Sequence, residues 1–384
     1  MSASDIRIIP VTSEDQRKEF AKFPWRIYKD DPLWVPPIYM DHLALLTPGK
    51  HPFWEHADQQ LFLAKRDGEL VGTISAHVNH RHNEIHKDKV GFFGFFETID
   101  DQAVADALFD AASGWLREQG MDAIRGPENP SQNEEVGLLV DGFHEPRVVM
   151  MMYNPRYYQG LVENAGFQKA QDLWAWDILT NIFDLNVQKL PRKFIRVAEQ
   201  AKQRENLEFR SLNMKHFVDD VQVAKVVYNE AWEINWGFVP FTDHEIEHLA
   251  KELKMILDPD LIILAFVDGK PAGIGLTIPN VYQAMVKARP QPNNWSLPWT
   301  LAKFLWHKRK VDSLRTLILG VVPEYRGMGI DALLYVETAR SAFRKGYQRC
   351  EMSWILESND MMNRILDRLG GNIYKTYRVY EKPL

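Results

Sequence analysis

The segment GVVPEYRGMGIDALL, residues 320–334, holds the residues whose types and spacing point most directly to chemistry. An apolar stretch leads into Arg326, Gly327 and Gly329, and a helix is predicted to open near Asp331. The first turn of a helix exposes unpaired N–H groups, glycine lets a ligand approach the backbone, and arginine adds a fixed cation. This combination predicts a pyrophosphate cradle, with a plain strand-to-helix turn as the alternative interpretation.

Two common phosphate loops do not fit this segment. No Lys-Ser or Lys-Thr pair follows the glycines, which excludes a P-loop. The glycine spacing also differs from that of a dinucleotide-binding βαβ unit, and no acidic residue stands where such a unit requires one. The loop is therefore expected to bind another phosphate-bearing ligand.

The elements around the loop occur twice in the chain. Segments 61–72 and 261–273 both predict a strand, an Asp-Gly turn and a second strand, and each precedes a strand, a helix, a strand, a short helix and a last strand. This order predicts an α/β (α+β) fold with a mixed, mostly antiparallel central sheet flanked by helices. We expect two copies, 1–185 and 206–384, joined by a helical connector at 186–205.

The two copies differ at the loop. When they are aligned at Gly120 and Gly346, Asp100 and Asp101 fall opposite Arg326 and Gly327. Carboxylates at a helix N-terminus suit the helix dipole as caps, but they would repel a phosphate. Only the second copy is therefore expected to hold an anion at this place.

The pattern V-x-P-E-Y-R-G-M-G-I-D-x-L-L resembles the acetyl-CoA-binding motif of the GCN5-related N-acetyltransferase (GNAT) superfamily, Arg/Gln-x-x-Gly-x-Gly/Ala. Arg326 and Gly329 match it, whereas Asp331 stands where the superfamily usually has Gly or Ala. Asn359 and Gly370 match the second motif of the superfamily. The resemblance implies a tandem protein with a degenerate N-terminal lobe and a C-terminal lobe that binds acetyl-CoA or another acyl-CoA.

The resemblance also implies where acyl-CoA would lie. The sheet would part beside the fourth strand, and a backbone N–H near Val321 or Val322 would polarise the thioester carbonyl. A neutral amine then attacks the thioester, and no metal is needed. The residues assigned to acyl-CoA by the resemblance are Leu319, Val321, Val322, Arg326, Gly327, Met328, Gly329, Ile330, Asp331 and Asn359.

The proton acceptor and the proton donor are left open by the sequence. Carboxylates that could serve as general base are Glu233, Asp243, Glu245 and Glu351. The usual tyrosine that protonates the thiolate would fall at Leu366, so Tyr374 or Tyr377 on the last strand is the predicted substitute. Ordinary surface carboxylates and packing tyrosines are the alternative interpretations.

An insertion at about 279–313 separates two strands of the second copy. Its WTLAKFLWHKRK stretch predicts a basic amphipathic helix, and loops of this length are often functional. A lid, a pocket wall and a peripheral membrane contact are the alternatives. The histidine-rich stretch HVNHRHNEIH would place His80, His82 and His86 on one side of a continued strand, which leaves a zinc site open beside a solvated hairpin end.

Composition narrows the class of protein. The net charge of −6 argues against broad nucleic-acid binding, and the single cysteine excludes an internal disulfide. No signal peptide and no transmembrane segment are predicted, so we expect a cytoplasmic protein, with a homodimer left open.

The predicted function is an acyl-CoA-dependent, and by resemblance acetyl-CoA-dependent, N-acyltransferase acting on a small-molecule or peptide amine. One alternative is an inactive CoA-binding or interaction module. An aminoacyl-tRNA-dependent transferase is a further alternative, against which the Arg-Gly-x-Gly loop counts, because that reaction does not need it.

Overall fold

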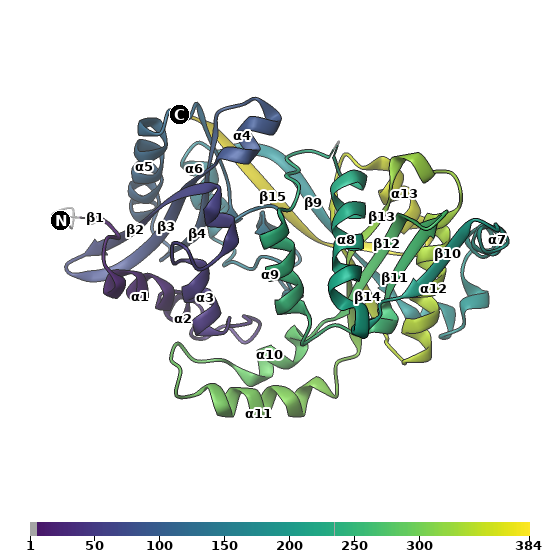
Figure 1. The fold of residues 1–384 in the computed structure, drawn as a ribbon. Coiled ribbons are helices and arrows are strands. Elements are labelled where there is room, and N and C mark those ends of the chain that lie inside the picture. The colour runs from purple at the N-terminus through teal and green to yellow at the C-terminus, as the bar shows by residue number, and fades with distance from the viewer. Residues whose placement is uncertain (1–5, 234) are drawn as a thin grey trace. The chain divides into compact units, whose positions relative to one another are not determined.

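The computed structural model describes residues 6–233 and 235–384, and its contacts group into two compact units. Unit 1 comprises Met1–Leu173, Tyr282–Lys310 and Lys375–Leu384, and unit 2 comprises Trp174–Val281 and Val311–Tyr374. The linear division into 1–185, 186–205 and 206–384 describes a repeated order of elements rather than contacts, and it stays a prediction. Figure 1 labels the elements of both units.

Unit 1 is built on a sheet in which β1, β2, β3, β4, β5 and β15 follow one another. All of these neighbours pair antiparallel except β4 and β5, which are parallel. Its elements are β1 (Ile6–Pro10), α1 (Glu14–Lys22), α2 (Pro24–Ile27), α3 (Tyr39–Leu45), β2 (Ala57–Arg66), β3 (Glu69–Asn79), α4 (His80–His86), β4 (Val90–Thr98), α5 (Gln102–Glu118), β5 (Ala123–Gly126), β6 (Glu128–Asn129), β7 (Glu135–Val136), β8 (Leu138–Asp141), α6 (Tyr158–Asn164), α10 (Tyr282–Ala288) and α11 (Leu297–Lys308).

Unit 2 is built on a second run of strands, β14, β13, β12, β11 and β10. Here only β13 and β14 pair in parallel. Its elements are α7 (Arg192–Lys202), β10 (Leu207–Ser211), α8 (Phe217–Ala231), α9 (Asp243–Leu253), β11 (Ile262–Val267), β12 (Lys270–Pro279), β13 (Ser313–Val321), α12 (Ile330–Arg344), β14 (Arg349–Leu356) and α13 (Asp360–Arg368). β9 (Gln168–Leu179) and β15 (Asn372–Pro383) each contribute residues to both units.

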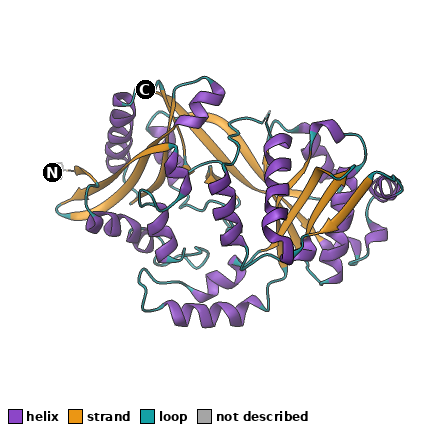
Figure 2. Cartoon of the chain, viewed as in Figure 1, coloured by secondary structure: helices purple, strands orange, loops and turns teal. Residues whose placement is uncertain are grey.

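The two units repeat one pattern of strand pairing, which Figure 2 shows as orange strands among purple helices. Each has an antiparallel hairpin, then a strand with a register shift, then a parallel partner. The shift falls opposite Thr73–Ser75 in unit 1 and opposite Leu276–Thr277 in unit 2. The predicted mixed, mostly antiparallel α/β architecture in two lobes is therefore confirmed.

Helix α5 begins as the sequence predicts. The Asp101 carboxylate accepts hydrogen bonds from the N–H groups of Ala103 (2.9 Å) and Val104 (3.4 Å). Arg66 lies 2.8 Å from the same side chain, and its hydrogen bond is the main reason that the pKa of Asp101 is lowered. A negatively charged cap therefore occupies the end of the helix that would face a phosphate in this lobe.

The insertion forms α10 and α11, and both belong to unit 1. The Trp25 indole N–H donates to the Pro290 carbonyl (2.9 Å), and the Arg289 guanidinium donates to the Asp31 carbonyl (2.6 Å). The histidine-rich stretch also differs from expectation, because His80–His86 is the helix α4 rather than a continued strand. Within residues 6–233 and 235–384, no helix is both long and apolar enough to cross a bilayer.

Candidate functional site

Unit 2 contains a fork between two parallel strands. β13 and β14 pair from Ser313 to Thr316 and from Arg349 to Met352, and the pairing described in the structure ends there although both strands continue. The register between β13 and β12 shifts at the same level, next to Leu276. A bulge increases the local twist of a strand and redirects its edge, so it accounts for the parting of β13 from β14.

The backbone of β13 presents amides to the fork. The Val322 N–H donates to the Ala272 carbonyl of the neighbouring edge (3.0 Å). Because successive amides of a strand point to opposite edges, the N–H groups of Val321 and Leu319 face away from β12 and toward the fork. Of the two amides predicted from the sequence, that of Val321 thus faces the fork and that of Val322 is bonded to the neighbouring edge.

The glycine loop at the start of α12 has two different environments. Gly327 and Gly329 both have left-handed backbone angles, with φ of 82° and 85°. A Cβ on Gly327 would meet nothing within 4 Å, whereas a Cβ on Gly329 would lie 2.9 Å from the Val197 side chain of α7. Gly329 therefore serves helix packing, and the open approach for a ligand is at Gly327 and the first-turn amides of Ile330 and Asp331.

Arg326 is exposed, but its guanidinium is already engaged. It donates to the carbonyls of Val321 (3.4 Å) and Ala231 (3.1 Å), so it ties the end of α8 to the end of β13. The neighbouring Met328 N–H donates to the Tyr325 carbonyl (3.4 Å). The cation lies beside the loop, and its position is set by backbone carbonyls.

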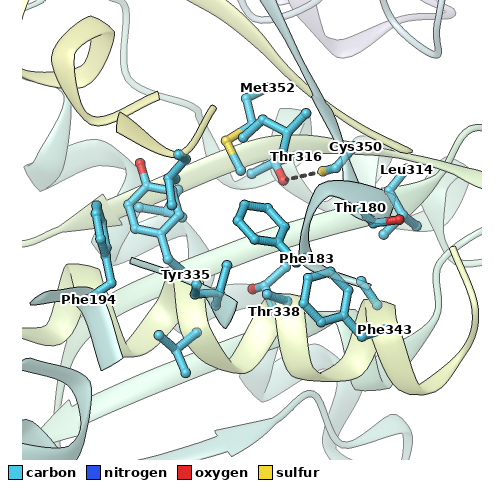
Figure 3. Close-up of a pocket in the computed structure, with 17 residues that line it drawn as sticks. Thr180, Phe183, Phe194, Leu314, Thr316, Tyr335, Thr338, Phe343, Cys350 and Met352 are labelled. Carbon is cyan, nitrogen blue, oxygen red and sulfur yellow. Dashed lines mark hydrogen bonds between the residues drawn. The ribbon is translucent and has the colours of Figure 1, made fainter. Parts of the chain in front are cut away.

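An apolar pocket lies on the α12 side of β13 and β14 (Figure 3). Its empty space, counted together with the open mouth, is about 640 Å³. Leu319 and Met352 line it at the fork, α12 contributes Tyr335 and Phe343, and Phe194 of α7 closes another side. This pocket thus begins where the strands part and continues along α12.

The polar groups of this pocket are few, and the buried Thr338 hydroxyl has no hydrogen-bond partner among the described residues. The Thr316 hydroxyl lies 3.4 Å from the Cys350 sulfur, drawn as a dashed line in Figure 3, and 2.8 Å from the Thr277 hydroxyl. Burial raises the pKa of the Cys350 thiol to about 11, so the thiol is protonated at neutral pH and is a poor nucleophile. The pocket is suited to an apolar ligand.

A buried polar network lies on the other face of the same strands. Side chains alternate along a strand, so Arg315 and Glu351 point away from Thr316 and Cys350. Glu351 accepts hydrogen bonds from the hydroxyls of Ser353 and Tyr374, and Arg315 donates to the Ser353 hydroxyl (3.0 Å). Two predicted catalytic residues, Glu351 and Tyr374, are therefore brought together.

The other predicted acid–base residues lie elsewhere. Glu233 is exposed just beyond α8, and Tyr377 is fully buried in unit 1, where it pairs with Leu139 of β8. Asp243 forms an ion pair with Lys225 (2.5 Å), and Glu245 is the capping-box residue of α9. These contacts give the last three a structural role.

Asn359 and Leu366 belong to α13. The Asn359 side chain accepts a hydrogen bond from the Met362 N–H (3.2 Å) and caps the helix. Leu366, at the place of the usual tyrosine, is fully buried in the unit 2 core.

The equivalent fork of unit 1 is filled by its own chain. β4 and β5 pair only from Val90 to Phe92 and from Ala123 to Arg125 in the described residues. Beyond that point the Asn129 side chain accepts a hydrogen bond from the Phe95 N–H (2.6 Å), and a Cβ on Gly94 would lie 1.8 Å from the Glu128 carbonyl oxygen. The segment at β6 thus occupies the space beyond the last parallel pair in unit 1.

Comparison with known proteins gives two full-length relatives, although no family model matches the chain. The chain is 37% identical over 390 residues to a bacterial ceramide synthase of Caulobacter vibrioides, covering 99% of this chain and 98% of that protein. It is 36% identical over 379 residues to protein YghO of Escherichia coli, covering 97% and 94%. This chain belongs to the same family as the bacterial ceramide synthase.

Solved structures place the fold of this chain among the tandem GNAT proteins. A tandem GNAT protein from the clavulanic acid biosynthesis pathway aligns with a TM-score of 0.57 at 10% identity, covering 99% of this chain and 98% of that one. A GCN5-related N-acetyltransferase from Sphaerobacter thermophilus aligns with a TM-score of 0.51 at 15% identity, covering 98% and 95%. The resemblance inferred from the loop is confirmed at the level of the fold.

Several residues of the candidate site were not identified from the sequence of this chain. Arg315 and Ser353 complete the Glu351 network, and the signal for Arg315 was a charge inside an apolar strand. Asn363 donates to the Leu356 carbonyl (3.1 Å) and accepts from the Trp176 indole (3.0 Å). No local pattern predicts the contact of Arg315 with Ser353 or that of Asn363 with Trp176, because these partners are 38 and 187 residues apart.

Unit 1 of this chain has a buried carboxyl group, which predicts that the stability of the protein depends on pH. Burial raises the pKa of Glu97 to about 8, while Tyr158 and Tyr28 donate to it (2.7 and 3.2 Å). Since the folded pKa exceeds the unfolded value near 4.5, its contribution to stability is lost as the pH rises toward 8. The free energy of unfolding of Glu97→Gln, compared with that of the natural chain, should therefore increase by up to about 1.4 kcal/mol for each unit by which the pH rises from 5 to 8.

Urea unfolding at pH 6, 7 and 8 measures this gain for Glu97→Gln. The exposed Glu118 of α5 provides the control, since Glu118→Gln should give a difference that does not change with pH. A pH-independent difference for Glu97→Gln would show that Glu97 is not protonated in the folded protein.

Proposed function

We propose that this protein is an acyl-CoA-dependent N-acyltransferase that joins a long acyl chain to the amine of a sphingoid base. The relative named bacterial ceramide synthase supports this acceptor, because a ceramide is an amide of such a base. The single observation that carries the proposal is the fork between β13 and β14, with the open glycine loop at the start of α12 and the apolar pocket on one face.

In this proposal, each part of the co-substrate lies along the fork. The pyrophosphate binds the amides of 327–331, where a helix N-terminus favours negative charge. The pantetheine arm follows the β13 edge past Leu319 and Val321, and the Val321 N–H donates to the thioester oxygen as negative charge develops there. The acyl chain enters the pocket beside Met352.

The reaction joins the two faces of the sheet at the fork. The acceptor nitrogen attacks the thioester carbon from the Glu351 face, the new C–N bond forms, and the C–S bond breaks. Glu351 accepts the proton that the nitrogen loses, directly or through one water. The thiolate is then protonated, and Tyr374 is the hydroxyl that we assign to this step because it is hydrogen-bonded to Glu351.

The pocket favours a longer acyl group than acetyl. Its lining combines side chains such as Leu314, Phe183 and Phe343, and burial of each methylene contributes about 0.8 kcal/mol. A two-carbon acyl group would leave most of that surface uncovered. Acetyl-CoA, the co-substrate implied by the loop alone, is thus replaced in this proposal by a long-chain acyl-CoA.

An inactive CoA-binding module is the second candidate, and the buried Leu366 favours it. Activity measurement distinguishes the two functions. Purified protein is incubated with palmitoyl-CoA and sphinganine, and released thiol and N-acyl product are quantified together. Equimolar thiol and amide are expected. CoA binding without amide formation, for sphinganine and for a panel of other amines, would support the inactive module.

The loop predicts a charge effect on CoA binding. Arg326→Glu should weaken CoA binding by more than about 10-fold, because the side-chain charge beside the phosphate changes from positive to negative. Isothermal titration measures the affinity. Arg364→Glu is the matched control, since Arg364 is an exposed arginine of α13 in the same unit and its replacement should leave affinity unchanged. Equal affinity of Arg326→Glu and Arg364→Glu would contradict the pyrophosphate placement.

A further inference from the structure

Helix α11 carries apolar side chains on its outer surface. Trp299 is 72% exposed, Trp306 is 67% exposed and Leu305 is 53% exposed. Leu297, Leu301 and, just before the helix, Trp295 are exposed as well. We name these six residues the α11 face. Clusters of large exposed apolar side chains on a soluble domain mark interaction sites.

The orientation of α11 is the reverse of that of an ordinary surface helix. The positions that face unit 1 include the small polar residues Ser296 and Thr300, both buried. At about 100° per residue, the α11 face occupies the remaining, outward side of the helix. Core packing therefore does not explain these tryptophans and leucines.

The helix is held in this orientation by unit 1. The segment that precedes it is fixed through Pro290 and Arg289, which bond to Trp25 and to the Asp31 carbonyl. Figure 1 shows α11 on the outer side of α10. The exposure of the α11 face is thus a property of a folded element with several anchoring contacts.

The charged residues in the sequence segment that contains α11 all have the same sign. Residues 269–311 contain no Asp or Glu, although the whole chain has a net charge of −6. The segment 282–310 includes Lys287, Arg289, Lys303, Lys308, Arg309 and Lys310. A basic helix with Trp and Leu on one side fits the headgroup region of a bilayer, where tryptophan is preferred and cations attract anionic lipid.

We propose that the α11 face docks this protein onto the surface of a bilayer that contains anionic phospholipid. The helix lies in the interface, because its 12 residues extend about 18 Å and the hydrocarbon core is about 30 Å thick. This inference does not depend on the proposed acyltransferase function. A second copy of the chain is the competing occupant of the α11 face, and the oligomeric state in solution tests it.

Vesicle flotation with the full chain tests the proposal. Wild-type protein should float with vesicles of phosphatidylcholine containing 30% phosphatidylglycerol, and its bound fraction should fall at least 5-fold on pure phosphatidylcholine or in 0.5 M salt. The double variant Trp299→Ala, Trp306→Ala should lower binding to anionic vesicles at least 10-fold. The matched control Met255→Ala, Met361→Ala removes exposed apolar side chains of unit 2 and should float as the wild type does.

Circular dichroism confirms that each variant is folded, and sedimentation gives its mass. Absence of wild-type binding to anionic vesicles would overturn the proposal. Equal loss of binding in the double variant and the control would overturn it too. A wild-type dimer that the tryptophan substitutions convert to monomer, without vesicle binding by either species, would assign the α11 face to self-association instead.

Discussion

Glu351→Gln should lower kcat for amide formation by about 10²-fold or more, while CoA affinity stays within about 2-fold of wild type. The glutamine side chain keeps the size of the carboxylate, and its one amide oxygen can still accept a hydrogen bond from either Ser353 or Tyr374, but it cannot take the proton of the attacking amine. Steady-state kinetics and CoA titration of the same preparation measure both quantities.

The pH profile separates catalysis by Glu351 from a purely structural role. Raising the pH deprotonates the amine in solution, so part of the lost rate should return in Glu351→Gln at pH 9 to 10. Glu233→Gln is the control, because this exposed carboxylate near the end of α8 is also a sequence candidate for the base. A large rate loss in Glu233→Gln with normal kinetics in Glu351→Gln would transfer the assignment to Glu233.

Ala339→Phe should lower kcat/KM for palmitoyl-CoA by about 100-fold and leave the value for a short acyl-CoA nearly unchanged. Ala339 lines the pocket from α12, so a phenyl ring there fills space that the chain would occupy. Displacing four methylenes at about 0.8 kcal/mol each costs about 3 kcal/mol, which corresponds to the expected change in kcat/KM. A series of acyl-CoA lengths measures the effect.

The control for the pocket is the same substitution at an exposed position. Ala103 of α5 is exposed in unit 1, and Ala103→Phe should not alter the dependence on chain length. If Ala339→Phe reduced activity equally for acetyl-CoA and palmitoyl-CoA, the pocket would not hold the acyl chain.

The fold was predictable because its signals are local and occur twice. The Asp-Gly hairpins at 67–68 and 268–269 both form, and the helices α5 and α12 end just before Gly120 and Gly346, which take the left-handed conformation that favours glycine. The contacts of β15 were not predictable, since nothing local in residues 375–383 indicates that they pair with β5 and belong to unit 1. The same applies to α10 and α11.

The site was predictable where backbone chemistry defines it and less so where side chains do. The positive φ angles of Gly327 and Gly329 follow from the motif, but the packing of Val197 on Gly329 depends on a connector whose partner is not visible in the sequence. Glu351 and Tyr374 were candidates, whereas Arg315 and Ser353 became apparent only from the register of β13 and β14. Strand register is a tertiary property, because it depends on which residues of two distant segments pair.

A crystal structure of this protein with a non-hydrolysable palmitoyl-CoA thioether tests the central claim most directly. We expect the pyrophosphate within hydrogen-bond distance of the 327–331 amides, the sulfur between β13 and β14 beyond Thr316 and Met352, and the alkyl chain in the pocket lined by Leu319 and Phe343. A ligand bound outside the fork, with the pocket empty, would contradict the account.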